Sequence, residues 1–443
     1  MSLMPDMQQT KVKNAIEMQN DRWYELIPLQ VQLDLMNAVG NGILYPVVPA
    51  GRRSGKTERF KRFLAKFAMR TIGGKFFAAA PTHNQAKKIF WDDLKAMTFS
   101  AIHPRKPSES DLIIYLPNGS EIHVVGLDKP ERIEGIAWTG GGIDEIANIK
   151  PNAWQENIYP ALNTYNPTNP DYQAWCWLLG VPEGLNHYYE MAQYAQNSGD
   201  PLWGLFHWKS SEILPPERIE ALKRSMSALQ FRQEFEASFE TASGRIYQDY
   251  NKHNTTIEEI YPHEQLSWCH DFNYTPMSSA IGVVRDNDVY YLDEIVLTSA
   301  ITRESALEFV DRYKDHQNRK LLIFGDPAGR AGEKHGHESD YTEMEDVLRQ
   351  NGWSFDRRVK KQHPAIKDRQ NALRRKICTA SGERTLFVNP NKCPYVHKGL
   401  STVQLKENST FLEIESEYQH ITTALGYHVD YEWPMEDDYT SIR

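Results

Sequence analysis

One short stretch of the sequence has the residue types and spacing of a phosphate-binding loop. The usual pattern is Gly, four residues, Gly, Lys and then Ser or Thr. Gly55, Lys56 and Thr57 fit this pattern, and Ala50 stands in place of the first glycine. In such a loop backbone N–H groups surround the phosphates, and the following helix adds the positive end of its dipole. We therefore expect Lys56 to reach the β- and γ-phosphates of ATP and Thr57 to hold Mg²⁺. The alternative is an ordinary glycine-rich turn before a basic helix.

An acidic pair, Asp144-Glu145, could complete the chemistry of this loop. Asp144 would join the metal shell, and Glu145 would be the general base for water that attacks the γ-phosphate. The segment that leads to this pair is unusual, because Gly140-Gly-Gly142 replaces the customary apolar strand. The alternative is a surface turn before Pro151.

Two further acids, Asp271 and Asp326, each end an apolar run in the second half of the chain. Acids at the ends of two strands, separated by a hairpin and a helix, are the layout of a two-metal nuclease on an RNase H-like sheet. Two metal ions about 4 Å apart would clamp the attacking and leaving oxygens of a phosphodiester. Each acid alone is more often a strand-end cap.

The elements that must position these residues alternate between strands and helices in the first half of the chain. Apolar runs predict strands at 75–80 and 175–179, and one-face spacing predicts helices behind the loop and at 84–97. A Pro-Asn-Gly turn predicts a hairpin of 111–116 with 121–127. This alternation is typical of a mostly parallel sheet with ligand loops at the strand ends. Residues 1–40 also read as helical.

The second half begins after a charged, helical stretch at 217–240 and a polar segment. Strands at 278–285 and 288–297 flank a short turn, and a helix, a strand and a second helix follow at 304–313, 320–324 and 342–350. We expect a last long helix from Phe411 to Val429, with an apolar stripe of Phe411, Ile414, Tyr418, Ile421 and Leu425. The predicted boundaries are an ATPase domain at 1–225, a linker at 226–262 and a nuclease domain at 263–443.

The composition is that of a globular protein of 443 residues with a net charge of −9. No apolar run approaches the ~20 residues of a membrane span, and the N-terminus lacks the apolar core of a secretory signal. Four scattered cysteines indicate buried, reduced thiols. A basic run from Arg357 to Lys376 on an otherwise acidic chain favours an enzyme that holds nucleic acid transiently, although a solvated helix face would look the same.

These motifs, in this order, resemble the large terminase subunit of tailed bacteriophages, of phage or prophage origin. The resemblance also includes Ala80-Pro81-Thr82 with Gln85, and Gln233-Glu234-Phe235 followed by Gly244-Arg-Ile-Tyr247. The segment Val181-Pro-Glu-Gly-Leu-Asn186 is similar to the coupling segment of the family. It implies an α/β fold in which a P-loop ATPase domain with a mostly parallel sheet precedes an RNase H-like nuclease domain. It implies ATP-driven translocation of double-stranded DNA into a procapsid and metal-dependent cutting of concatemeric DNA.

The resemblance assigns further roles residue by residue. Gln30 (or Gln32) would contact adenine, and Arg52 or Arg53 could stabilise transition-state charge within the subunit. Arg132 could do so from a neighbouring subunit of a ring. The implied ATP-binding residues are Gln30, Ala50, Gly51, Arg52, Arg53, Ser54, Gly55, Lys56, Thr57 and Asp144, with Mg²⁺ on Thr57 and Asp144. The nuclease would use Mg²⁺ or Mn²⁺.

Two positions depart from the family pattern. Val181 replaces a hydroxyl residue in the coupling segment, which leaves the backbone or Asn186 to sense the γ-phosphate. Thr423 stands where the third nuclease acid is expected. Asp430 is kept as the third metal ligand, and Glu294 is another choice.

The implied partners are double-stranded DNA, the small terminase subunit, the portal protein and further copies of the chain in a ring. The implied location is the cytoplasm of the bacterial host, and no membrane is expected as a partner. One alternative is a helicase-like ATPase that remodels nucleic acid, with a non-catalytic second domain. Another is a non-enzymatic nucleic-acid-binding or assembly protein with a decayed loop.

Overall fold

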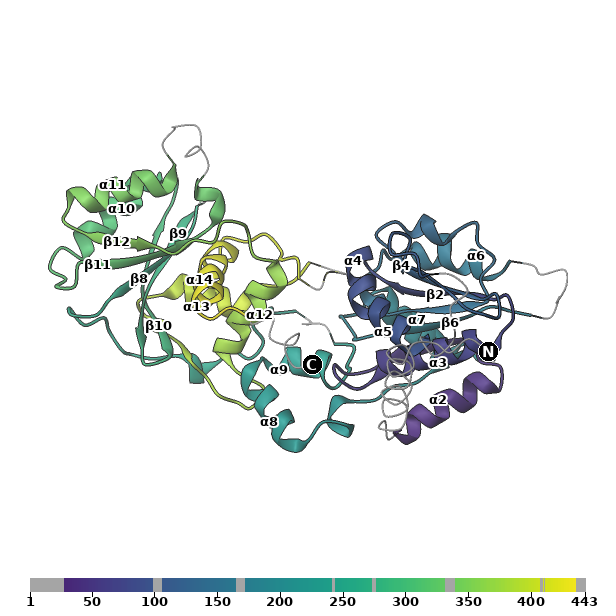
Figure 1. The fold of residues 1–443 in the computed structure, drawn as a ribbon. Helices are drawn as coiled ribbons and strands as arrows, with labels where there is room; N and C mark the ends of the chain where they lie inside the picture. Colours follow the sequence, from purple (N-terminus) through teal and green to yellow (C-terminus); the bar gives the residue numbers. More distant parts are fainter. Residues whose placement is uncertain are drawn as a thin grey trace, which may run out of the picture. The chain divides into compact units, whose positions relative to one another are not determined.

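The computed structural model describes residues 28–98, 106–164, 172–240, 244–272, 276–330, 339–406, 409 and 411–435. These residues form two compact units, which are described separately (Figure 1). Unit 1 lies within Met1–Pro216 and Arg232–Glu240, and unit 2 lies within Glu217–Phe231 and Thr241–Arg443. The segment predicted as a linker is therefore divided between the two units. The predicted helix in 1–27 lies outside the described residues.

Unit 1 is built on a seven-stranded sheet in the order β3-β4-β2-β5-β6-β1-β7. β3 runs antiparallel to β4, and every other neighbouring pair is parallel, as predicted from the alternation of strands and helices. The strands are β1 Tyr45–Pro49, β2 Lys75–Ala80, β3 Ile113–Tyr115, β4 Glu121–Gly126, β5 Gly140–Ile143, β6 Trp175–Gly180 and β7 Trp203–Leu205.

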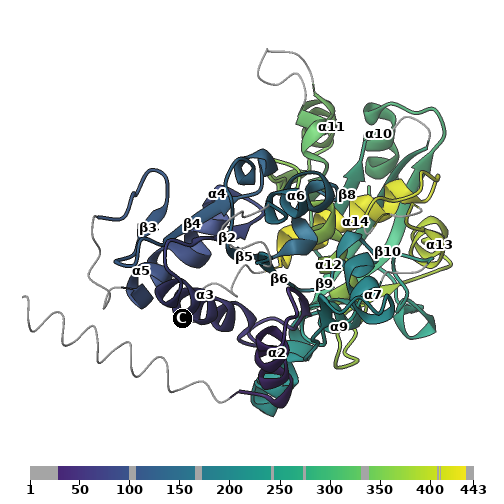
Figure 2. The ribbon, with the colours of Figure 1, turned by 90° about the vertical axis from the view of Figure 1, so that its right-hand side faces the viewer.

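Helices cover both faces of this sheet (Figures 1 and 2). One core contains side chains from α2, α3 and α5, and the other contains side chains from α7 and from the segment around α6. The helices are α2 Gln30–Gly40, α3 Lys56–Arg70, α4 His83–Ala86, α5 Asp92–Thr98, α6 Tyr159–Leu162 and α7 His187–Asn197. The predicted helix at 84–97 is present, with a π-helical turn, η1 Lys87–Trp91, between α4 and α5. Shorter turns are η2 Pro130–Ile133, η3 Ile146–Asn148, η4 Trp154–Ile158 and η5 Ser210–Glu212.

Aromatic rings explain the three glycines of β5. A Cβ on Gly141 would lie 2.5 Å from Cε1 of Phe77, and one on Gly142 would lie 2.6 Å from Cζ of Phe60. The rings lie over the strand and supply the buried apolar surface that larger strand residues would otherwise provide. The strand thus stays in the centre of the sheet without side chains of its own until it reaches Ile143.

Unit 2 is built on a mixed six-stranded sheet in the order β12-β11-β8-β9-β10-β13. β9 is antiparallel to β8 and β10, while β11 is parallel to β8 and β12, and β13 is parallel to β10. The strands are β8 Leu266–Asp271, β9 Met277–Arg285, β10 Asp288–Leu297, β11 Lys320–Gly325, β12 Ser354–Arg357 and β13 Leu386–Val388. The predicted hairpin of 278–285 with 288–297 is confirmed.

The faces of this sheet carry different helices. Side chains of α10 and α11 share one core with Trp268, and side chains of α12, α13 and α14 share the other with Cys269, which points the opposite way along β8. These helices are α10 Thr302–Arg312, α11 Asp340–Gln350, α12 Ile366–Ile377, α13 Pro394–Thr402 and α14 Gln419–Glu432, with short turns η6 Lys252–Asn254 and η7 Pro327–Arg330. Two further helices, α8 Pro216–Ser225 and α9 Ala228–Glu234, precede them in the chain, and the last three residues of α9 belong to unit 1.

The last helix differs from the prediction of a helix at 411–429. α14 begins at Gln419, because residues 411–414 are extended and pair with the chain at 404–406. Ile414, assigned to the apolar stripe, is 42% exposed. Residues 421–430 are all buried, so α14 is enclosed on all sides rather than along one stripe.

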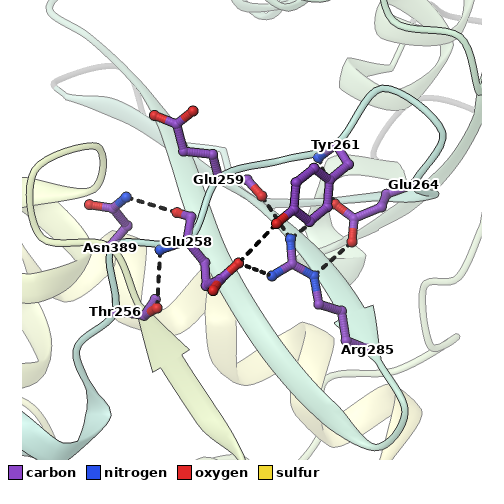
Figure 3. A network of polar contacts seen from close by, with 7 residues as sticks. All are labelled: Thr256, Glu258, Glu259, Tyr261, Glu264, Arg285 and Asn389. Carbon is purple, nitrogen blue, oxygen red and sulfur yellow. Dashed lines mark hydrogen bonds and ion pairs between the residues drawn. The ribbon is translucent and has the colours of Figure 1, made fainter.

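A polar network holds the chain where it enters β8 (Figure 3). The guanidinium of Arg285 donates to the Glu264 carboxylate at 2.7 Å, to the Glu258 carboxylate at 3.0 Å and to the Glu259 carbonyl at 2.7 Å. Asn389 donates to the Glu258 carbonyl at 2.9 Å. These contacts fix the start of β8, and Asp271 lies at the other end of that strand.

The four cysteines are buried and form no disulfide, as predicted. Within the described parts of the chain, no helix has the length and apolar character needed to cross a membrane.

Candidate functional sites

The phosphate-loop residues lie between β1 and α3. Gly55 precedes α3 with φ of 79°, and Arg53 has φ of 59°, so two left-handed residues turn the chain back toward the helix. Lys56 and Thr57 then open the helix with their N–H groups at its positive end. Burial lowers the pKa of the Lys56 amine, and its nearest polar contact in the loop is the Gly51 carbonyl at 3.4 Å.

Two segments far along the sequence hold the loop backbone from outside. The Gly51 N–H donates to the Trp208 carbonyl at 3.1 Å, and the Arg52 N–H donates to the Glu234 carbonyl at 2.7 Å. The Ser210 hydroxyl donates to the Arg52 carbonyl at 2.6 Å. These contacts come from Trp208 and Ser210, which no motif marks, and from Glu234, which is part of the segment Gln233-Glu234-Phe235 that resembles the family.

Ala50, the departure from the loop pattern, continues β1. It is fully buried, forms a bridge to Trp208 and donates its N–H to the Gly180 carbonyl at 3.1 Å. The residue that cannot carry a side chain is Gly51 instead. A Cβ there would lie 2.5 Å from the Phe235 carbonyl oxygen and 2.7 Å from the Ser210 nitrogen.

The first residue of the acidic pair contacts the end of the loop. The Thr57 hydroxyl donates to Oδ2 of Asp144 at 2.5 Å, and Asp144 follows β5, a neighbour of β2 and β6 in the same sheet. Threonine and carboxylate oxygens in direct contact are the pair that would share one Mg²⁺ ion. The buried aspartate and the start of α3 therefore form one small polar site.

Glu145 is held in an unusual conformation beside this pair. Its φ is 54°, which is rare for a residue with a Cβ and costs of order 1 kcal/mol or more. Burial and the Asp144 carboxylate raise the pKa of Glu145, while Arg52 and Lys56 hold it down. Gln85 donates to its carboxylate at 3.3 Å. A glutamate with a raised pKa beside the Thr57–Asp144 contact is suited to general-base chemistry.

The coupling segment binds the turn that follows the acidic pair. Asn186 donates to the Ala147 carbonyl at 3.0 Å, and its side-chain oxygen caps α7 by accepting the Tyr188 N–H. His187 bonds to the Ile146 carbonyl at 2.8 Å. Asn186, which was one choice for sensing the γ-phosphate, thus has structural partners on both sides.

The other predicted ATP-site residues lie in different surroundings. Gln30 is exposed and donates to Asp34, whereas Gln32 is buried and donates to the Ser54 carbonyl of the loop at 3.3 Å. Arg52 forms an ion pair of 3.0 Å with Glu234. Arg132 lies on η2, exposed, and pairs with Asp128 at 3.2 Å. The geometry favours Gln32 over Gln30 as the glutamine next to the loop.

The two acids of unit 2 leave neighbouring strands at the same edge. Gly325 of β11 pairs with His270 of β8, so the next residues, Asp326 and Asp271, lie side by side. His420 Nδ1 lies 3.1 Å from Oδ2 of Asp271, and this contact raises the pKa of His420. His363 Nδ1 lies 3.3 Å from Oδ1 of Asp326.

Neither predicted choice for a third acid is available at this edge. Asp430 is buried in an ion pair with Lys360. Glu294 accepts the N–H groups of Tyr395 and Val396 at 2.8 and 2.9 Å, at the start of α13. No three His, Cys, Asp or Glu side chains converge as a metal site in the described ranges.

The basic run from Arg357 to Lys376 is largely occupied by internal contacts. Arg358 pairs with Glu432, Arg374 donates to the Ile246 carbonyl, and Lys376 donates to the Asn287 carbonyl. These contacts hold α12 and the end of α14 in unit 2. They do not support the interpretation that the whole run is a surface for holding nucleic acid.

The fold and the loop define an α/β protein of two units, of which the first carries a phosphate loop joined to an acidic pair. Within that class, residues 48–159 match the family model described as terminase large subunit, T4likevirus-type, N-terminal. The predicted resemblance to phage large terminase subunits is thereby confirmed.

Relatives agree with this resemblance. The large terminase subunit of Thermus phage G20c is 25% identical over 264 residues, which are 52% of this chain and 52% of the relative. That of Escherichia phage T5 is 24% identical over 262 residues, 54% of this chain and 57% of the relative. The chain spans about half the length of the curated relatives it matches.

Solved structures show the same fold over most of the chain. The large terminase of the thermophilic bacteriophage D6E superimposes with a TM-score of 0.57 at 16% identity, covering 88% of this chain and 93% of that one. Its complex with ADP gives 0.56 at 15% identity, covering 94% and 98%. At this identity the likeness concerns the fold.

Proposed function

We propose that this chain is a DNA-packaging terminase subunit that hydrolyses ATP to translocate double-stranded DNA into a procapsid and cuts concatemeric DNA with a metal-dependent nuclease. The observation that carries the ATPase half is the contact between Thr57 at the start of α3 and Asp144 after β5. It brings the two oxygen ligands expected for Mg²⁺ together at the phosphate loop.

The roles at the ATP site follow from this contact. Lys56 would bind the phosphates, Thr57 and Asp144 would hold the Mg²⁺ ion, and Glu145 would accept a proton from the attacking water. Arg52 would leave its ion pair with Glu234 and bind a negatively charged phosphate at the loop. Exposed Arg132 stays a prediction for a contribution from a neighbouring copy in a ring.

Glu145→Gln tests the base. It keeps the shape and the neighbours of the carboxylate but removes proton acceptance, so ATP turnover should fall about 10²–10⁴-fold while ATP binding persists. Steady-state hydrolysis and a nucleotide titration on one preparation measure both. Asp34→Asn, on the exposed face of α2, is the matched control. Turnover near the wild-type rate in Glu145→Gln would remove Glu145 from this role.

The strand arrangement of unit 2 supports the nuclease half of the proposal. The order β10-β9-β8-β11-β12, three antiparallel strands followed by parallel ones, matches an RNase H-like sheet, with Asp271 and Asp326 at the edge where such nucleases hold metal. Asp271→Asn or Asp326→Asn should abolish Mg²⁺- or Mn²⁺-dependent plasmid cleavage and leave ATP hydrolysis intact. Undiminished cleavage in both variants would remove this site.

The missing third acid favours a second candidate function, a nucleic-acid-remodelling ATPase whose second unit does not cut. Plasmid cleavage decides between the two, because only the terminase proposal requires it. We further propose that double-stranded DNA, a small terminase subunit and a portal protein are the partners, in the host cytoplasm.

A further inference from the structure

Glu145 has a left-handed backbone conformation with hydrogen bonds on both sides of it. Its φ is 54°, its N–H donates to Oδ1 of Asp144 at 2.9 Å, and its carbonyl accepts the Asn148 N–H at 2.9 Å. Residues with a Cβ are disfavoured in this region by about 5- to 30-fold, so the conformation persists only where the surroundings enforce it. The turn η3, which follows Glu145, is where the surroundings act.

Two side chains at the start of α7 bind the carbonyls of this turn. Nε2 of His187 lies 2.8 Å from the Ile146 carbonyl, and Nδ2 of Asn186 donates to the Ala147 carbonyl at 3.0 Å. A carbonyl oxygen only accepts, so Nε2 of His187 carries the proton of this bond. Burial lowers the pKa of His187, which keeps the ring neutral at pH 7. The two carbonyls belong to the residues that directly follow Glu145.

Apolar packing holds the same turn against the end of β6. The side chains of Ile146 and Tyr188 are fully buried, and a Cβ on Gly180 would lie 3.1 Å from the Tyr188 ring and 3.4 Å from Cγ2 of Ile146. This packing places the turn, but apolar contacts have no direction and do not orient its peptide groups. Hydrogen bonds do. One bond shifts an equilibrium by about fivefold and two by about 30-fold, which matches the bias against the left-handed region.

We propose that His187 and Asn186 are positioning residues, which hold the Glu145 carboxylate at the phosphate loop through the turn η3. This inference rests on the proposed role of Glu145 as the general base. The start of α7 therefore sets the rate of ATP hydrolysis and not the affinity for nucleotide. His187 directly follows the coupling segment, which ends at Asn186.

Steady-state kinetics and a nucleotide titration on the full chain test this role. His187→Ala removes one bond, so kcat for ATP hydrolysis should fall about fivefold while the Kd for ATP changes less than about twofold. Asn186→Ser should lower kcat similarly, because serine keeps an oxygen that caps α7 but has no amide to reach the Ala147 carbonyl. His187→Gln, whose amide nitrogen is as far along the side chain as Nε2 of histidine, should restore most of the rate. Gln196→Ala, exposed on α7, is the control and should change neither value.

A double variant separates positioning from an independent effect. Because His187 acts through Glu145, His187→Ala should cause no further loss of turnover in a Glu145→Gln background, measured in single-turnover reactions. A further loss of the same size there would overturn the inference. Wild-type kcat in both His187→Ala and Asn186→Ser, or a raised Kd with unchanged kcat, would also overturn it. Wild-type turnover in Glu145→Gln alone would instead remove the general base and, with it, the proposed function of this site.

Discussion

Gly51→Ala should disable nucleotide binding because the added methyl group has no room in the loop. Its Cβ would lie 2.5 Å from the Phe235 carbonyl oxygen and 2.7 Å from the Ser210 nitrogen, both backbone atoms that cannot rotate away. Overpacking of this kind costs about 1–3 kcal/mol. If that cost falls on the phosphate-binding conformation, the Kd for ATP rises about 5- to 150-fold.

Titration with a fluorescent ATP analogue measures this change, and Ala50→Gly is its matched control. Ala50 lies one residue earlier in the same loop, and removing its methyl group creates no overlap, so its Kd should change less than about threefold. Mn²⁺-dependent plasmid cleavage by unit 2 shows that the variants remain folded elsewhere. Wild-type affinity in Gly51→Ala would refute the argument that close contacts with Phe235 and Ser210 set the conformation of the loop.

Three further predictions concern packing and protonation. Gly141→Ala should lower the melting temperature, since its Cβ would lie within 2.5 Å of a buried ring. Gly40→Ala is the control, because a Cβ there has open space around it and should not lower the melting temperature. Equal melting curves for the two variants would contradict the packing argument. Burial raises the pKa of Glu294 to about 7, so between pH 4.5 and 7 the folded state binds a proton that the unfolded state has released. The free energy of unfolding therefore falls by about 3 kcal/mol as pH rises through that window. Urea unfolding of Glu294→Gln should therefore gain on the wild type from pH 5 to pH 8, and a constant difference would refute this. Arg52→Ala removes a charge that holds down the pKa of Glu145, so the acid limb of the ATPase pH profile should move to higher pH; an unmoved limb would contradict the assignment.

Much of unit 1 could be predicted because its signals are local. The loop pattern, the apolar strand at 75–80 and the Pro-Asn-Gly turn each depend on neighbouring residues, and the structure places all three as expected. The contacts that hold the loop could not be predicted in this way. Ser210 reaches the loop from a segment more than 150 residues away, where nothing in the local sequence marks it, and Glu234 was marked only as part of a family match and not as a contact of the loop.

The end of the chain shows why the acidic edge was harder to predict. A one-face stripe was expected for the last helix, but residues 421–430 are all buried, so the apolar residues do not mark one buried face. Asp430 looked suitable from its charge, yet Lys360 neutralises it.

The central claim is that one chain carries two separate active sites, an ATPase in unit 1 and a nuclease in unit 2. The most direct test measures ATP hydrolysis and Mn²⁺-dependent plasmid cleavage on the same preparations of Lys56→Ala and Asp326→Asn. We expect Lys56→Ala to lose hydrolysis and keep cleavage, and Asp326→Asn to show the reverse. If either variant loses neither activity, or if the wild-type chain neither hydrolyses ATP nor cuts DNA, the proposed function is wrong.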